Sequence, residues 1–204
     1  MSRSYFNTID NLSLQDIESD ADLIPLMTTE DEEALENEAL PKSVPILPLI
    51  NTVLFPGVVI PITAGRDKSI KLIKDASKAD KIIGVIAQRN SDVENPGVQD
   101  IHKMGTVAQI LRVLKMPDGN TTIIIQGKKR FKIKSIIKEQ PYLKAEIESV
   151  RDEHPIKSDD KEFNATIDSI KDLALQIIQE NPNIPTEATF AIKNIRTPSF
   201  LINF

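Results

Sequence analysis

The sequence predicts an α+β protein, in which a small antiparallel β-barrel or pseudobarrel with one inserted helix precedes a bundle of α-helices. Between residues 43 and 152, short apolar segments alternate with turn residues, which is typical of closely spaced strands. One segment among them, 66–78, instead spaces its apolar residues by three and four, as a helix does. After Arg151 the helical spacing takes over. Strands followed by helices favour the α+β class.

Six or seven strands are expected in the first region, at 46–50, 58–62, 81–88, 105–115, 121–126, 130–138 and 142–150. The last two alternate apolar and charged residues, which predicts one buried face and one solvated face. Pro45 and Pro48 predict that the first is an edge strand, because proline cannot donate a hydrogen bond to a neighbouring strand. Pro117-Asp118-Gly119-Asn120 predicts a hairpin with a type I′ turn, since Asp-Gly tolerates positive φ.

Three helices are expected in the second region, beginning after Ser158 or Asp159, at Pro185 and after Thr197. Asn181-Pro182 should end the first, and Pro198 suits the first position of the third. The third helix runs only to Phe204, on apolar residues and without a C-terminal cap. We therefore expect the chain to be cut from a longer polypeptide, with a truncated helical bundle.

Charge divides the chain into three parts. Residues 1–42 hold eleven acidic and two basic residues and show no sustained apolar period, so we expect a mostly disordered acidic extension. Residues 43–152 hold 18 basic and 11 acidic residues and form the expected β-rich subdomain. Residues 153–204 form the expected helical subdomain.

Composition excludes several kinds of chemistry. The chain has no cysteine, which excludes disulfides, cysteine-ligated zinc and thiol catalysis. The two histidines, His102 and His154, lie in polar segments, and neither a Gly-x-Ser-x-Gly elbow nor a P-loop spacing is present. We expect no catalytic residue, no cofactor site and no metal site in this chain. Without a long apolar run or a signal peptide, a cytoplasmic location and no membrane contact are expected.

Several motifs resemble those of one family, in its order and spacing. Leu47 to Ile62, which reads LPLINTVLFPGVVIPI, resembles the opening motif of the N-terminal domain of Lon proteases, and Gly65 to Ile70 resembles the start of the helix that follows it. Further matches are Ile86-Ala87-Gln88, Pro96-Gly97, Gly105 to Ala108, Leu114 to Gly119, Gln126 to Ile133 and Pro198 to Leu201. The resemblance covers about four-fifths of the chain and is highly specific.

The resemblance implies a pseudobarrel of the PUA-like type followed by helices, which together recognise substrates for an ATP-dependent serine protease. In that family the complete enzyme degrades misfolded and selected short-lived regulatory proteins. It is a homohexamer with an ATPase that uses ATP and magnesium and with a Ser-Lys peptidase, and none of these catalytic elements lies in this chain. The acidic extension departs from many family members, and its role is open.

Two apolar turns are the candidate substrate-binding residues: Val53, Leu54 and Phe55 in one, and Met116 and Pro117 in the other. A receptor for unfolded segments needs accessible apolar surface, and methionine suits permissive contacts. Core packing of the first turn and incidental exposure of the second remain the alternatives.

A basic run offers another interpretation, because Lys128, Lys129, Arg130, Lys132 and Lys134 could contact nucleic acid or another polyanion. A solvated face that discourages pairing between sheet edges is the other explanation for the run. The alternative function is accordingly a stand-alone adaptor or nucleic-acid-binding module without protease activity.

Overall fold

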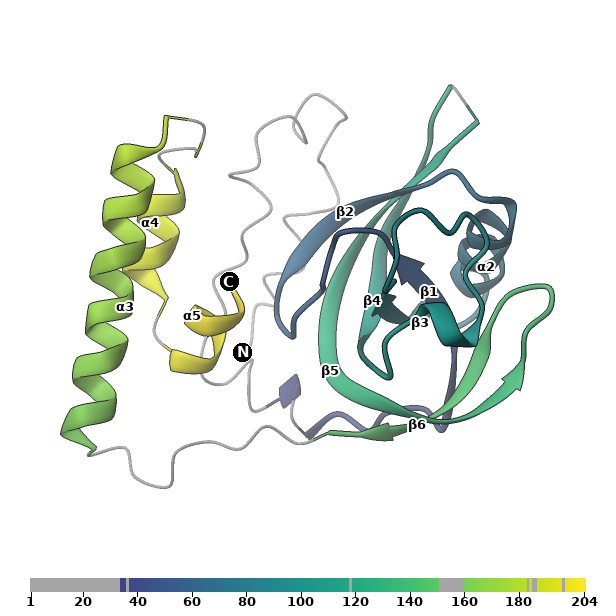
Figure 1. The fold of residues 1–204 in the computed structure, drawn as a ribbon, viewed down its shortest axis with the longest axis horizontal. Coiled ribbons are helices and arrows are strands. Elements are labelled where there is room, and N and C mark those ends of the chain that lie inside the picture. The colour runs from purple at the N-terminus through teal and green to yellow at the C-terminus, as the bar shows by residue number, and fades with distance from the viewer. Residues whose placement is uncertain are drawn as a thin grey trace, which may run out of the picture. The chain divides into compact units, whose positions relative to one another are not determined.

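The protein is described from a computed structural model (Figure 1). It describes residues 34–35, 37–117, 119–150, 160–182, 184, 187–195 and 197–204. Most of the expected acidic extension, His154 and the expected caps Ser158 and Asp159 lie outside these residues. The described elements fall into two compact units, one with the strands, α2 and α5, the other with α3 and α4. The third expected helix therefore belongs with the strands, although the sequence grouped it with the other helices.

The strands of the described residues are β1 (Ser43–Leu49), β2 (Val59–Ala64), β3 (Ile82–Ala87), β4 (Met104–Lys115), β5 (Thr121–Lys138) and β6 (Lys144–Ser149). The helices are α2 (Asp67–Ser77), the 3₁₀ turn η4 (Val98–Asp100), α3 (Lys161–Glu180), α4 (Glu187–Asn194) and α5 (Pro198–Asn203). The α+β class predicted from the sequence is confirmed.

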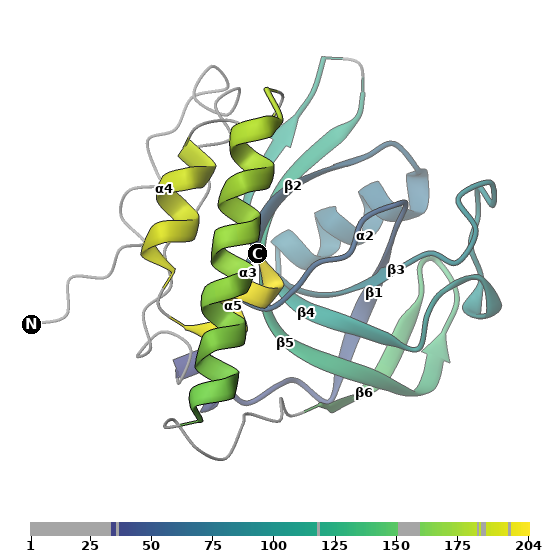
Figure 2. The same cartoon turned by 60° about the vertical axis from the view of Figure 1, so that its left-hand side comes forward.

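The strands form one sheet in the order β2-β5-β4-β3-β1-β6, and β6 also pairs with β5. Figure 2 shows that β4 and β5 curve strongly, which allows β6 to pair with both β1 and β5. The sheet is mixed, because β1 runs parallel to β3, whereas the other pairs are antiparallel. The antiparallel pairing predicted from the sequence is therefore wrong for β1 with β3 and right for the other pairs. The chain between β1 and β3, which contains β2 and α2, is long enough for the crossover that parallel pairing requires.

β1 has partners on both sides, so the prediction of an edge strand was also wrong. β6 pairs with residues 43–45 and β3 with residues 46–49. Ile46 N–H donates to Leu143 O, on the β6 side. Backbone groups alternate sides along a strand, so the nitrogen of Pro48, like that of Ile46, faces the β6 side. The pairing with β6 has already ended at this position, so the missing N–H of Pro48 breaks no bond. Pro45 lacks its N–H on the β3 side, before that pairing begins. Both prolines are tolerated because each falls where no donor is needed.

β5 is one strand of 18 residues, although the sequence suggested two with a break near Gly127. The register against β4 shifts there: Ala108 lies opposite Gly127, and Val107 opposite Lys129. Lys128 is therefore the extra residue of a β-bulge, which bends a strand without ending it.

Two clusters of buried side chains fill the unit that contains the sheet. The first includes Leu47, Leu54, Ile83 and Ile123, and Leu72, Ile73 and Ala76 of α2 pack in it. The second surrounds Phe131, which is fully buried, with Val44, Ile46, Ile86, Val107 and others. Successive residues of β1 enter different clusters, so both faces of this strand are buried.

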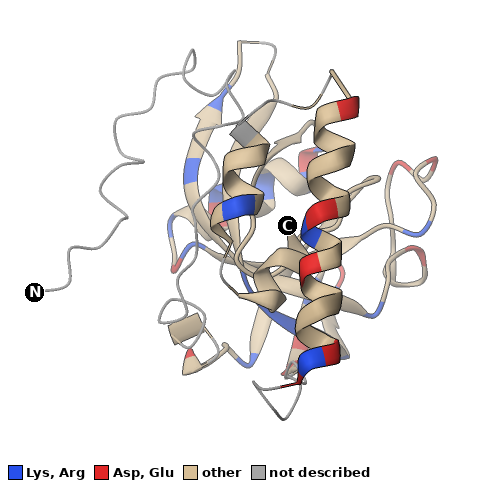
Figure 3. Cartoon of the chain, turned by 90° about the vertical axis from the view of Figure 1, so that its left-hand side faces the viewer, with Lys and Arg blue, Asp and Glu red and all other residues tan. Residues whose placement is uncertain are grey.

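The second unit pairs α3 with α4. The N-cap of α3 is Asp160, whose carboxylate accepts hydrogen bonds from the N–H groups of Glu162 and Phe163 at 3.0 and 3.1 Å. Lys171 Nζ donates to Ile195 O at 2.8 Å, which connects α3 to the end of α4. Charged residues of both signs lie along α3 (Figure 3). Ile167 is buried, whereas Ile177 is exposed.

Candidate functional site

The first candidate turn lies between β1 and β2 and is a type II β-turn. Val58 N–H donates to Phe55 O at 3.3 Å, Pro56 occupies the second position and Gly57 the third. Gly57 has a φ of 81°, which this turn type requires at that position and which glycine adopts without strain. The sequence Phe-Pro-Gly therefore fixes the direction in which the loop leaves the sheet.

Hydrogen bonds fix this loop to the sheet at three points. Gly57 N–H donates to Gly127 O, and Gly127 N–H donates to Val58 O, both at 2.9 Å. The hydroxyl of Thr106, which is buried, donates to Leu54 O at 2.6 Å. These bonds join the loop backbone at Leu54, Gly57 and Val58 to β4 and β5.

The loop directs its three candidate residues to opposite sides. Leu54 is only 3% exposed and belongs to the first core cluster, so it cannot contact a partner; including it among the substrate-binding residues was wrong. Val53 and Phe55 are 58% and 38% exposed. An extended segment alternates its side chains, so burying Leu54 turns both neighbours outward. This alternation could have been recognised in the sequence.

α5 adds exposed apolar residues beside the loop. Asn203 Nδ2 approaches Pro56 O at 3.5 Å, which brings the end of this helix next to the turn. Phe200 and Leu201 are buried, whereas Ile202 and Phe204 are exposed. We name Val53 and Phe55 the apolar loop surface. The sequence indicated that the helix was apolar but not that it lies beside Pro56.

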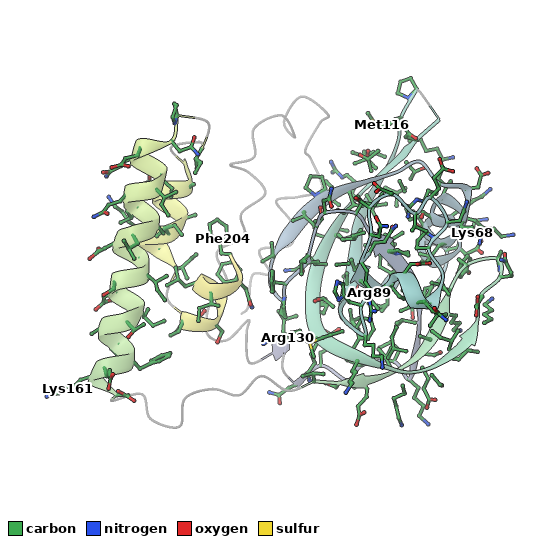
Figure 4. The ribbon with its side chains drawn as sticks, viewed as in Figure 1. Lys68, Arg89, Met116, Arg130, Lys161 and Phe204 are labelled. Carbon is green, nitrogen blue, oxygen red and sulfur yellow. The ribbon has the colours of Figure 1, made fainter. Side chains whose placement is uncertain are left out.

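The second candidate turn is the tip of the β4–β5 hairpin, with Met116 near its end in Figure 4. The predicted hairpin is confirmed. Met116 N–H donates to Asn120 O at 3.0 Å, so the loop between this pair has three residues instead of the two of a type I′ turn. Met116 is half-buried and Pro117 exposed. The tip adjoins the start of β5 at Thr121, seven residues before the bulge at Lys128. Figure 4 shows Met116 well apart from Phe204.

The basic run lies on β5, beside the first turn. Lys128 Nζ forms an ion pair with Glu38 Oε2 at 3.2 Å. Lys132 and Lys134 are exposed, and Lys129 and Arg130, the latter labelled in Figure 4, are half-buried. Phe131, the aromatic residue in the run, is fully buried, so it cannot stack on a base.

A polar cluster that the sequence did not single out lies at the start of α2. Arg66 Nη2 donates to Gln88 Oε1 at 3.1 Å and to Val93 O at 3.3 Å. Gln88 is buried, and its amide nitrogen donates to Asn90 O and Val93 O. The cluster holds the segment after β3 and contains no group suited to catalysis. Arg66 and Gln88 both lie in motifs quoted above, so those motifs encode a structural contact.

Among the described residues, no group of three or more His, Asp or Glu side chains could hold a metal ion. His102 is exposed. In the same part of the chain, no helix combines the length and the apolar character needed to cross a membrane.

Comparison with known proteins decides the family. Residues 43–204 match the model of the ATP-dependent protease La (LON) substrate-binding domain. The chain belongs to this family. The Lon protease of Flavobacterium johnsoniae is 65% identical over 204 residues, which are 100% of this chain and 25% of that protein. The Lon protease of Cytophaga hutchinsonii is 51% identical over 90% of this chain and 22% of that protein.

The Lon substrate-binding domain described here thus spans about a quarter of the length of these relatives. Its fold resembles the N-terminal domain of the Lon protease of the Mycobacterium avium complex, with a TM-score of 0.61 and 24% identity. That comparison covers 79% of this chain and 80% of the other. The resemblance inferred from the sequence motifs is confirmed.

Proposed function

We propose that this Lon substrate-binding domain captures unfolded or degron-bearing segments of proteins through the apolar loop surface. The observation that carries the proposal is that Val53 and Phe55 are exposed on a loop whose backbone is bonded to β4 and β5. Fixed apolar side chains bind without the entropic cost of ordering a mobile loop. A small apolar area also keeps the affinity low enough for release.

The relatives support a wider proposal for the whole polypeptide. They are named Lon proteases and are about four times as long as this chain. We propose that the domain delivers substrates to an ATP-dependent serine protease with a Ser-Lys peptidase, which uses ATP and magnesium, is a homohexamer and acts in the cytoplasm. The ring of strand pairings through β6 supports the proposed PUA-like pseudobarrel for the receptor.

A stand-alone nucleic-acid module is the less favoured function. The family match is to a substrate-binding domain, and the buried Phe131 removes the aromatic that stacking on β5 would need.

The test is a binding titration of the chain with a permanently unfolded model protein and with its folded form. We expect binding to the unfolded form. Replacing Val53 and Phe55 together by serine should weaken binding by roughly tenfold, because partial burial of two such side chains contributes about 1–2 kcal/mol. Ile137→Ser is the matched control, since Ile137 has a similar exposure, 55%, and lies ten residues beyond Gly127 on β5.

Equal losses in the loop variant and in the control would contradict the assignment of this surface. Met116→Asp tests the hairpin tip separately. If the tip also contacts substrates, this change should weaken binding without lowering the melting temperature, and unchanged affinity would remove the tip from the proposal.

A further inference from the structure

We propose that Lys128, at the head of the run Lys128–Arg130, is an anion-binding position for acidic polypeptide. It would bind a carboxylate of the same substrate whose apolar segment contacts the loop surface. In the free chain Glu38 occupies this position and competes with the substrate. The inference rests on the proposed function, and it specifies the class of segment that the domain prefers: apolar residues next to acidic ones.

The position of Lys128 follows from the contacts that hold the loop. Gly127 exchanges backbone hydrogen bonds with Gly57 and Val58, and Lys128 is the next residue on the strand. A basic side chain therefore follows immediately after the anchor of the loop that displays Val53 and Phe55. An extended peptide rises about 3.3 Å per residue, so a few residues beyond its apolar contacts suffice to reach Lys128.

The β-bulge at Lys128 supports a role beyond strand pairing. Val107 lies opposite Lys129 and Ala108 opposite Gly127, which leaves Lys128 without a partner residue on β4. Bulges redirect a side chain relative to its neighbours and are over-represented next to functional sites. One of the irregularities of β5 thus falls at the residue that meets a carboxylate.

The structure already holds a polypeptide carboxylate at this position. Glu38 Oε2 lies 3.2 Å from Lys128 Nζ, whose side chain is 15% exposed while that of Glu38 is 43% exposed. Leu40 packs against the second core cluster and brings this segment to the sheet. Residues 30–38 of the sequence carry six acidic residues and no basic one, so Glu38 belongs to an acidic stretch of the kind proposed as ligand.

Because Glu38 already pairs with Lys128, a substrate carboxylate must displace Glu38 in order to bind there. A group on the same chain has a high effective concentration, which raises the concentration of acidic substrate needed to displace it. The bond itself is weak, because a partly exposed ion pair contributes little and is screened by salt. Substrates with an acidic stretch can therefore replace Glu38, whereas purely apolar substrates leave it in place.

The ligand is polypeptide in this proposal because the observed occupant is a side-chain carboxylate, and the fully buried Phe131 offers no stacking surface. Nucleic acid then becomes an outcome of the test.

The test uses the 204-residue chain and two fluorescent peptides with the same apolar block, followed by four Glu or by four Gln. Affinities are measured by anisotropy at low ionic strength. We expect the Glu peptide to bind about threefold tighter than the Gln peptide, as one partly exposed ion pair allows. Glu38→Gln should increase only the affinity for the Glu peptide, by about two- to threefold.

Lys128→Gln should abolish the preference for the Glu peptide. Lys138→Gln, which removes a charge at the far end of β5, should keep it. Equal binding of the two peptides, both to the original chain and to the Glu38→Gln variant, would overturn the inference and leave the proposed function standing. Failure of both peptides to bind would overturn both. Tighter, Lys128-dependent binding of a single-stranded oligonucleotide would assign the position to nucleic acid and overturn the inference.

Discussion

Gly127→Ala is the sharpest test of the bonds that hold the substrate loop. A Cβ at position 127 would overlap the carbonyl oxygen of Phe55, lie 2.9 Å from its carbonyl carbon and approach Thr106 Cγ2 to 3.2 Å. The first two atoms belong to the backbone and cannot rotate away. The loop must therefore move off β5, or β5 must bend away from the loop.

The expected loss of stability follows from the bonds that this movement breaks. The two backbone hydrogen bonds that Gly127 exchanges with Gly57 and Val58 contribute about 0.5–1.5 kcal/mol each. Leu54, now 3% exposed, would lose part of a burial that stabilises by about 1.5–3 kcal/mol. A total of about 2–4 kcal/mol is expected, which is a large share of the roughly 5–15 kcal/mol that usually separates folded from unfolded protein.

Urea denaturation followed by circular dichroism would measure this difference. The control is Gly97→Ala, because a Cβ there would meet only Asp100 Oδ2, at an ordinary 3.6 Å, and should change stability by less than about 0.5 kcal/mol. Unfolding of the two variants at the same urea concentration would contradict the predicted collision with Phe55. Thr106→Val removes the bond to Leu54 O separately, at about 1–3 kcal/mol. Combined with Gly127→Ala it should cost less than the sum, because both act on one loop.

Two further predictions concern contacts outside the loop. Burial, then a hydrogen bond to Asp75 and the charge of its carboxylate, raise the pKa of Tyr142 above 10.0; the folded state thus retains the phenol proton longer than the unfolded state. This contribution to the free energy of unfolding should be fully present below pH 10 and should be lost as the pH rises through the raised pKa of Tyr142. Denaturation of the original chain and of Tyr142→Phe at a series of pH values should show that the substitution removes this loss. Gln88→Met should destabilise by about 1–3 kcal/mol, because Arg66 loses its bond to Gln88 Oε1 and both Asn90 O and Val93 O lose the bond from the Gln88 amide. The change should also speed amide hydrogen exchange between residues 90 and 93, and unchanged exchange would contradict the assigned contact.

Local patterns predicted the elements that local chemistry determines. The helix at 67–77, the hairpin after Lys115 and the start of α5 after Thr197 all follow from apolar spacing or turn residues close together in the chain. Each needs information from only a few neighbouring positions.

Long-range pairing explains what the sequence did not reveal. Nothing near Pro45 indicates that β6 stops pairing before Pro48, so an edge strand was the natural reading of these prolines. The run at Gly127 looked like a break, because a bulge and a loop share the same residue types. The approach of Asn203 to Pro56 and of Glu38 to Lys128 likewise depends on segments far apart in the chain.

Three of the separated family motifs meet at one loop, which explains why residues of such different kinds are needed together. The motif from Leu47 to Ile62 supplies the turn and its exposed Phe55. The motif from Gly105 to Ala108 supplies Thr106, whose hydroxyl donates to Leu54 O. The motif from Gln126 to Ile133 supplies Gly127, the position where a Cβ would collide with the loop. None of these polar or glycine positions contacts a ligand in the proposed role. Their effect is to remove the freedom of the loop before a substrate arrives. A receptor that must release its substrate can have little apolar area, and a small area binds only if little entropy is lost on binding. The rigid support is therefore as necessary to the proposed recognition as the apolar side chains themselves.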